Sequence, residues 1–288
     1  KHPYALSKDE EEIMSRLESA FLNCEKLQDH MRFLLNKGGL YKVYNGNLLY
    51  HGCVPLKEDG TLKSVRLYGR SYKGKSLYEV LESYVRKGFY ALNKKEKERG
   101  KDMMWYIWLS ENSPLFGKDK MATFERYFLA EKETHKEKKN PYYNLLENEK
   151  VINMILKEFG LTEESAHIIN GHVPVKVITG ESPIKCNGKV LVIDGGFSRA
   201  YQKQTGIAGY TLIYNSYGLI LAAHEPFEST EAAIEKESDI HSDSVVVKRV
   251  LERKLVGDTD IGQELKEQIE DLKMLLQAYR SGEITERM

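Results

Sequence analysis

Cysteine is scarce in this sequence, charge is balanced and long apolar runs are missing. The three cysteines, Cys24, Cys53 and Cys186, are far apart and include no Cys-x-x-Cys pair, which argues against a disulfide framework and a thiolate zinc site. The 43 Lys and Arg residues match 43 Asp and Glu residues, so the basic face that nucleic acid or anionic lipid requires is lacking. No apolar run approaches the roughly 20 residues that span a bilayer. We therefore expect a soluble cytoplasmic protein with no nucleic-acid partner and no membrane partner.

Helical periodicity dominates the start and the end of the chain. Ser7 and Glu10 form a capping box, and the apolar spacing that follows runs on until Gly38, which predicts one long amphipathic helix. Ser76 and Glu79 form a second capping box ahead of another apolar stripe. Further helices are expected over 145–159, 229–234 and 259–279.

Short strands separate these helical segments. Asn45 and Gly46 lie between two apolar runs within 40–56, which predicts a β-hairpin because Asn-Gly is a strong turn signal. Four more strands are expected at 167–175, 189–193, 210–214 and 219–223, where glycines interrupt apolar residues. The residues alone thus indicate a mixed α+β protein.

Two histidines lie at the ends of apolar strands beside glycine. His51 occurs in Leu-Leu-Tyr-His-Gly-Cys-Val-Pro, and His172 occurs in Ile-Ile-Asn-Gly-His-Val-Pro-Val. Strand ends are where α/β sheets assemble their sites, and neutral imidazole is a common ligand of divalent transition metals. One such histidine more often hydrogen-bonds within a turn, whereas the matching pair favours a shared metal.

Longer motifs carry a family resemblance over most of the chain. They include Met-Trp-Tyr-Ile-Trp at 104–108, Ser-Pro-Leu-Phe-Gly-Lys at 113–118, Asn-Gly-His-Val-Pro-Val at 170–175 and Ile-Asp-Gly-Gly-Phe-Ser at 193–198. Together these segments resemble class III fructose-1,6-bisphosphatases of the calcineurin-like metallophosphoesterase superfamily. The segments around His51 and His172 are similar to two metal-ligand motifs of that superfamily.

The resemblance implies a binuclear metal centre. His51 and His172 would bind one divalent metal, with Mn²⁺ as the expected cofactor, and the metals would lower the pKa of a bridging water toward about 7. The superfamily's other ligands come from Asp-x-His, Gly-Asp-x-x-Asp-Arg-Gly and Gly-Asn-His motifs that precede these histidines. We interpret Asp239-Ile240-His241 and Gly257-Asp258 as chance matches, because both follow His172 in polar stretches. The catalytic residues are therefore unknown and are expected upstream of this chain.

The implied architecture is the C-terminal part of one metallophosphoesterase domain, an α/β/β/α sandwich. Residues 1–288 would supply a helical insertion at 76–160, a C-terminal sheet at 165–225 and terminal helices at 229–288. The expected partners are the N-terminal half of the same protein and a second copy in a homo-oligomer. A chain that lacks the bridging carboxylates is expected to have no activity by itself.

The resemblance also implies an activity and a substrate. The whole protein would hydrolyse the 1-phosphate of fructose-1,6-bisphosphate in gluconeogenesis, as a hydrolase of carbohydrate metabolism. Arg70, Lys73 and Lys75 follow His51 in a glycine-containing segment and could bind a substrate phosphate, although an exposed loop that is simply basic is the more common explanation of such a segment. Two alternatives stay open: a metallophosphoesterase acting on another phosphate ester, and a non-catalytic interaction or regulatory module.

Overall fold

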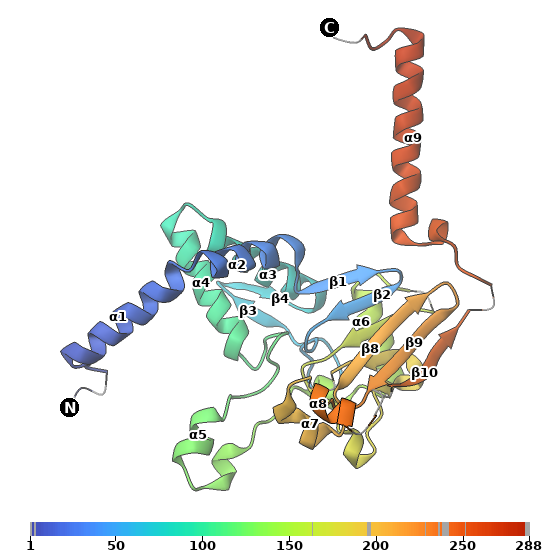
Figure 1. The fold of residues 1–288 in the computed structure, drawn as a ribbon. Helices are drawn as coiled ribbons and strands as arrows, with labels where there is room; N and C mark the ends of the chain where they lie inside the picture. The colour runs from blue at the N-terminus through green and yellow to red at the C-terminus, as the bar shows by residue number, and fades with distance from the viewer. Residues whose placement is uncertain are drawn as a thin grey trace.

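The computed structural model describes residues 2, 4–162, 164–194, 197–227, 229–235, 237, 242–250 and 252–285. Helices and strands alternate along this part of the chain (Figure 1), which confirms the mixed α and β content predicted from the sequence. Among the helices described there, none combines the length and the apolar character that crossing a bilayer requires.

The central sheet has five strands in the order β1–β2–β5–β7–β6. β1 and β2 form the predicted hairpin, and both turn residues have positive φ, 49° at Asn45 and 73° at Gly46, as a type I′ turn requires. β2, β5 and β7 are parallel neighbours, so their carboxyl ends meet at one edge of the sheet. The strands are β1 (Tyr41–Tyr44), β2 (Asn47–Tyr50), β5 (His167–Asn170), β6 (Ile184–Lys185) and β7 (Val190–Val192).

A second sheet is antiparallel, in the order β10–β9–β8. Its strands are β8 (Gly209–Asn215), β9 (Gly218–His224) and β10 (Ser242–Arg249). The segment 165–225, expected to form one C-terminal sheet, is therefore divided between two sheets. β10 also lies within 229–288, which was expected to be helical; its Val245, Val246 and Val247 are β-branched and fit a strand better than a helix.

Helices fill the crossover between β2 and β5, after a small hairpin of β3 (Val65–Leu67) and β4 (Arg70–Tyr72). α3 begins at Gly74, where the Ser76 hydroxyl accepts a hydrogen bond from the Lys73 N–H at 3.2 Å, so Ser76 is not the cap residue that was predicted. α3 spans Gly74–Tyr90. The other elements of the crossover are α4 (Lys94–Leu109), α5 (Thr123–Phe128), α6 (Glu149–Glu158) and the 3₁₀ turns η1 (Lys132–His135) and η2 (Pro141–Asn144).

α3 and α4 pack closely through glycine. Gly88 and Gly100 are both buried where the two helices meet. A Cβ on Gly88 would lie 2.9 Å from the Gly100 carbonyl carbon, and one on Gly100 would collide with the Gly88 backbone. The helices approach this closely only because both residues lack side chains.

The predicted N-terminal helix is two helices, α1 (Lys8–Leu22) and α2 (Glu25–Lys37). α1 begins at the Ser7–Glu10 capping box, as predicted. Its end is set by Asn23, whose side-chain amide donates to the Ser19 carbonyl at 3.0 Å, while Cys24 turns to extended backbone. The apolar periodicity continues across this break, so periodicity alone could not reveal it.

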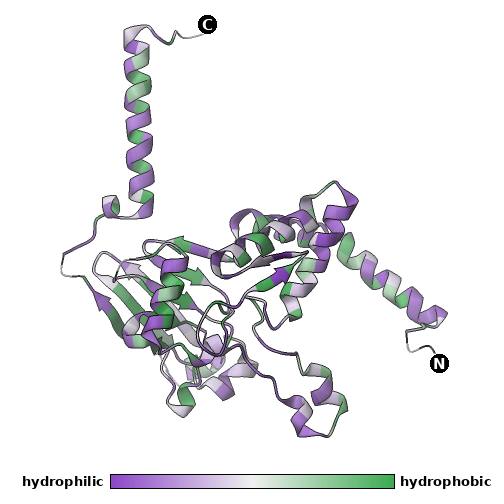
Figure 2. Cartoon of the chain, turned by 180° about the vertical axis from the view of Figure 1, so that it is seen from behind, coloured by the Kyte–Doolittle hydropathy of each residue, from purple (hydrophilic) through white to green (hydrophobic). Residues whose placement is uncertain are grey.

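α9 (Asp260–Ser281) projects from the body of the molecule at the opposite end from α1 (Figure 1). Both helices carry alternating polar and apolar stripes (Figure 2), and their large apolar side chains are exposed, including Phe21 at 66% and Leu272 at 64%. The remaining elements are α7 (Arg199–Thr205), α8 (Thr230–Glu235) and the 3₁₀ turns η3 (Val177–Thr179), η4 (Cys186–Gly188) and η5 (Val256–Asp258).

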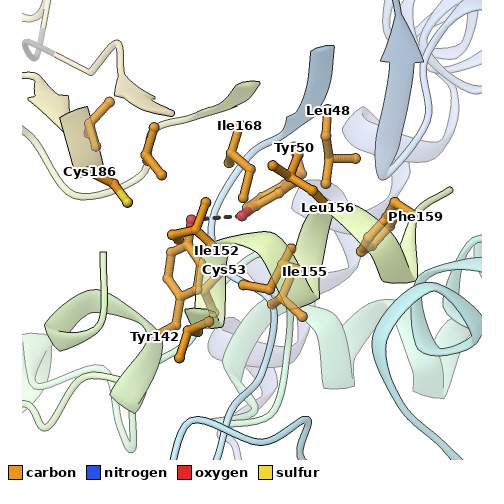
Figure 3. Close-up of a cluster of buried hydrophobic side chains, with 14 of the residues drawn as sticks. Leu48, Tyr50, Cys53, Tyr142, Ile152, Ile155, Leu156, Phe159, Ile168 and Cys186 are labelled. Carbon is orange, nitrogen blue, oxygen red and sulfur yellow. Dashed lines mark hydrogen bonds between the residues drawn. The ribbon is translucent and has the colours of Figure 1, made fainter. Parts of the chain in front are cut away.

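The main core lies between the central sheet and α6 (Figure 3). Alternation along β5 sends Ile168 into this core and Ile169 to the opposite face, where Leu219 of β9 covers it. The described chain therefore forms helix, sheet and sheet layers. At the centre of the core the hydroxyls of Tyr50 and Tyr142 are 2.7 Å apart, so each phenol has a hydrogen-bond partner.

Residues 117–140 leave the body as a flap that carries α5 and η1 (Figure 1). Its two ends are joined by backbone hydrogen bonds from Asn140 to Gly117 and from Asp119 to Lys138, each 2.9 Å long. Lys118 and Lys139 face each other in this stalk as an isolated β-bridge. The two ends of the flap are thus held together at its base.

Candidate functional site

Three parallel strands deliver polar side chains to one edge of the central sheet. His51 follows β2, His172 follows β5 after one glycine, and Asp194 lies two residues beyond β7. Backbone hydrogen bonds continue the pairing past the strands, from Gly171 N–H to the His51 carbonyl and from Ile193 N–H to the Asn170 carbonyl, both 2.9 Å. The three side chains therefore line one cavity of about 760 Å³.

The two predicted imidazoles are in contact although they are 121 positions apart in the sequence. His51 Nε2 and His172 Nδ1 are 3.0 Å apart, and the ring planes meet at 68°. Two nitrogens bound to one metal at about 2.1 Å, with about 90° between them, would be about 3.0 Å apart. The pair therefore has the spacing of adjacent ligands, which is also the length of a hydrogen bond between the rings.

Local backbone geometry explains the glycine beside each histidine. A side chain at Gly52 would collide with the Pro114 carbonyl, and a Cβ at Gly171 would lie 3.3 Å from Asp194 Cβ. His172 has φ of 66°, the left-handed region, where a bulky residue is held only if its surroundings impose it. The buried Asn170 amide supports this turn by donating to the Gly52 carbonyl at 3.0 Å.

Burial keeps both imidazoles neutral at physiological pH. It is the main cause that lowers the pKa of His172 to about 4, with smaller contributions from His51 and Lys118. Burial also lowers the pKa of His51, opposed by the attraction of Asp194. Neutral imidazole is the form that binds metal, so the electrostatics favour ligation over protonation.

Sequence reasoning missed Asp194. In the sequence it belongs to the Ile-Asp-Gly-Gly-Phe-Ser segment at 193–198, which carries the family resemblance and predicts no site residue, and Gly195 and Gly196 lie outside the described residues. The signal was its place at the end of a strand parallel to those that carry the histidines. The Asp194 carboxylate borders Gly171 and raises the pKa of both imidazoles, so it acts electrostatically on the pair.

The ligands present fit one side of a metal site. Within the described parts of the chain, no cluster of three or more His, Cys, Asp or Glu side chains could enclose an ion. Two neutral imidazoles at ligand spacing nevertheless suit a divalent transition metal, provided that further ligands come from elsewhere. Asp239 and His241 lie outside the described residues, and Asp258 accepts a hydrogen bond from the Leu255 N–H at 2.9 Å.

The predicted phosphate-binding cations do not border the imidazole cavity. Arg70 is in β4, Lys73 precedes α3 and Lys75 lies in the first turn of α3. None of the three is among the described residues that line the cavity beside His51 and His172. Lys75 borders another cavity, of about 830 Å³, and its ammonium is 3.8 Å from Glu79. Their role in substrate binding stays a prediction.

Other histidines have structural partners. His224, at the end of β9, lies 2.7 Å from the Thr211 hydroxyl and 2.9 Å from the Ser242 hydroxyl, one at each ring nitrogen. The three cysteines are all unpaired, as predicted, with Cys53 and Cys186 buried and Cys24 exposed.

Comparison with known proteins identifies the family. The family model described as Firmicute fructose-1,6-bisphosphatase matches residues 1–281. Class 3 fructose-1,6-bisphosphatases of Alkaliphilus metalliredigens and Clostridium novyi are each 57% identical over the whole chain, and that of Clostridium tetani is 55% identical. The chain spans less than half of these relatives, 44%, 43% and 44% of their lengths respectively.

No solved structure matches the chain significantly, so the metallophosphoesterase sandwich stays a prediction. The motifs from 104–108 to 193–198 that carried the sequence resemblance lie within the matched residues. Because the family model covers nearly all of its length, this chain belongs to the Firmicute fructose-1,6-bisphosphatase family.

Proposed function

We propose that the polypeptide containing this chain hydrolyses the 1-phosphate of fructose-1,6-bisphosphate, and that His51 and His172 bind one metal of a binuclear centre. The observation that carries the proposal is the contact between the two imidazoles, 3.0 Å apart, in a member of this family. Mn²⁺ is the proposed metal, gluconeogenesis the proposed pathway and the cytoplasm the proposed location.

Divalent cations, when bound, would supply Lewis acidity and lower the pKa of water toward about 7. The chain's own residues prepare the site: His51 Nε2 and His172 Nδ1 lie 3.0 Å apart, and Asn170 fixes the turn between them through Gly52. Asp194 favours positive charge beside the rings. The remaining ligands are proposed to come from the part of the protein not contained in this chain.

Single substitutions of the two histidines test this assignment. In the natural polypeptide, His51→Ala and His172→Ala should each lower kcat for fructose-1,6-bisphosphate by more than the roughly 10–100-fold that loss of an outer-shell partner costs. Metal content, measured by mass spectrometry of the purified protein, should fall with activity. His30→Ala, an exposed position in α2, is the matched control. Wild-type metal content in both variants would refute the ligand assignment.

The isolated 288-residue chain provides a second test. It should show no turnover of fructose-1,6-bisphosphate with Mn²⁺, because two imidazoles alone cannot organise two metals. Robust turnover by this chain would show that it contains a complete site.

A related phosphoesterase acting on another ester is the competing enzyme hypothesis. Parallel assays of the natural polypeptide with several sugar phosphates and phosphopeptides separate the two, since the proposal requires fructose-1,6-bisphosphate to have the highest kcat/KM. The exposed apolar faces of α1 and α9 favour an additional interaction role. A non-catalytic module would bind a partner through these helices and would show no hydrolysis in any of the assays.

A further inference from the structure

One carboxylate in the flap, that of Glu137, forms ion pairs with two cations. Lys118 Nζ is 3.0 Å from Glu137 Oε2, and Arg126 Nη2 is 3.3 Å from Glu137 Oε1. Glu137 also accepts a hydrogen bond from the Ala122 N–H at 3.0 Å, so its position is fixed from both sides of the flap. A single negative charge shared between two positive ones leaves an excess of positive charge at this place.

More positive charge surrounds the pair. Lys139 faces Lys118 across the stalk of the flap, and burial, then Lys118 and Lys176, lower the pKa of Lys139. The acids nearby are Asp119, Glu137 and Glu181; Asp119 accepts a hydrogen bond from the Lys138 N–H at 2.7 Å, and Glu181 is engaged by Lys185 at 3.3 Å. The base of the flap thus gathers more cations than carboxylates, an arrangement that attracts an anion.

These cations share a cavity with the imidazole pair. A largely apolar cavity of about 890 Å³ is lined by Lys118, Arg126 and Glu137 on one side and by His51 and His172 on another. Lys118 is also close enough to contribute to the lowered pKa of His172. A ligand bound at the imidazoles would therefore have room to extend toward the flap cations within one cavity.

A sugar bisphosphate carries two dianionic groups, and only one of them can be at the reacting centre. The other needs a cationic site at a distance set by the sugar, preferably one with the planar guanidinium that binds phosphate oxygens in pairs. We propose that Lys118 and Arg126 form the subsite for the second, non-reacting phosphate of the substrate, with Glu137 as the residue that positions both cations. This inference rests on the proposed function for the identity of the ligand.

Lys118→Gln and Arg126→Gln in the natural polypeptide test the subsite by kinetics. Each should lower kcat/KM for fructose-1,6-bisphosphate by about tenfold or more, mainly through KM, because a charge-assisted hydrogen bond is lost. Hydrolysis of p-nitrophenyl phosphate should fall by a smaller factor, since this substrate has no second phosphate whose contacts can be lost. Lys138→Gln is the matched control, an exposed flap lysine that pairs with Glu58 at 3.2 Å.

Equal losses for both substrates would overturn the subsite, because they would place the cations at the reacting phosphate. The subsite would also be overturned if kcat/KM for fructose-1,6-bisphosphate fell in the Arg70→Gln, Lys73→Gln, Lys75→Gln triple variant but did not fall in Lys118→Gln or Arg126→Gln.

A binding measurement separates the subsite from the proposed function. Calorimetric titration of inorganic phosphate into the protein treated with chelator removes any metal contribution, so binding reports the flap cations. Wild type and Lys138→Gln should bind phosphate, and Lys118→Gln and Arg126→Gln should bind it at least about fivefold more weakly. Absence of binding to the metal-free wild type would overturn the subsite whatever the hydrolysis assays show. Binding without hydrolysis of fructose-1,6-bisphosphate would instead overturn the proposed function alone.

Discussion

His167 begins β5 with its side chain only 7% exposed. Burial, followed by the charges of Lys248, Lys189 and Lys254, lowers its pKa to about 4 from the ordinary value of 6.5. Between these pH values the unfolded chain binds a proton that the folded chain excludes, so the free energy of unfolding should fall as pH decreases from 6.5 to 4. The loss should be on the order of 3 kcal/mol, from about 1.4 kcal/mol per pKa unit.

Urea unfolding of the natural polypeptide at a series of pH values measures this effect. His167→Gln should flatten the dependence, because glutamine does not titrate, and His30→Gln, at an exposed position in α2, should leave it unchanged. An unaltered pH slope in His167→Gln would show that other groups cause the acid sensitivity.

Residues at the site were predictable where the signal is local. His51 and His172 are each marked by a strand and an adjacent glycine, and Gly52 is required because the Pro114 carbonyl occupies the space of a side chain. Lys118 and Arg126 carry no such signal, since only the path of the flap brings them to the imidazoles. Cations near His51 in sequence therefore looked more suitable than cations near it in space.

The pairing of α3 with α4 depends on two glycines. Gly100→Ala would force a Cβ into the Gly88 backbone, and overpacking of this kind typically costs about 1–3 kcal/mol. The small gain in helix propensity from alanine, about 1 kcal/mol, opposes this only in part. We expect a net loss of stability, seen as a lower midpoint of urea unfolding.

The control for this substitution is Lys95→Ala, at an exposed position of the same helix, which changes helix propensity without altering packing. Stability equal to wild type in Gly100→Ala would mean that the two helices can separate slightly without cost.

Elements were predicted best where the termination signals are strong. The Asn45-Gly46 turn and the end of α6 at Gly160, with φ of 87°, follow directly from residues that tolerate positive φ. The break between α1 and α2 was missed because Asn23 acts through a side-chain bond to the preceding turn. β10 was missed because its valines lie in a polar region, where they form a strand only by pairing with β9.

The molecule as a whole exposes two amphipathic helices at its extremities (Figure 2). In α9 the apolar residues follow the alternating three- and four-residue spacing of a coiled-coil seam, as in Leu265, Ile269, Leu272, Leu276 and Tyr279. We expect the 288-residue chain to self-associate, with a molar mass by light scattering above the monomer value of 33.2 kDa.

Leu272→Glu combined with Leu276→Glu should reduce this association by placing charge in the seam. Glu264→Gln with Glu267→Gln, on the same helix outside that seam, is the control. A monomeric molar mass at all concentrations of the wild-type chain would show that neither helix face drives self-association.

The distance along the chain between the two imidazoles has a consequence for biosynthesis. A ribosome that adds about 5–20 residues per second needs roughly 6 to 24 seconds to advance the 121 positions from His51 to His172. During that interval the first histidine has been added to the chain while its counterpart does not yet exist. Capture of a metal by the pair is thereby postponed until all the crossover helices described between β2 and β5 have been translated.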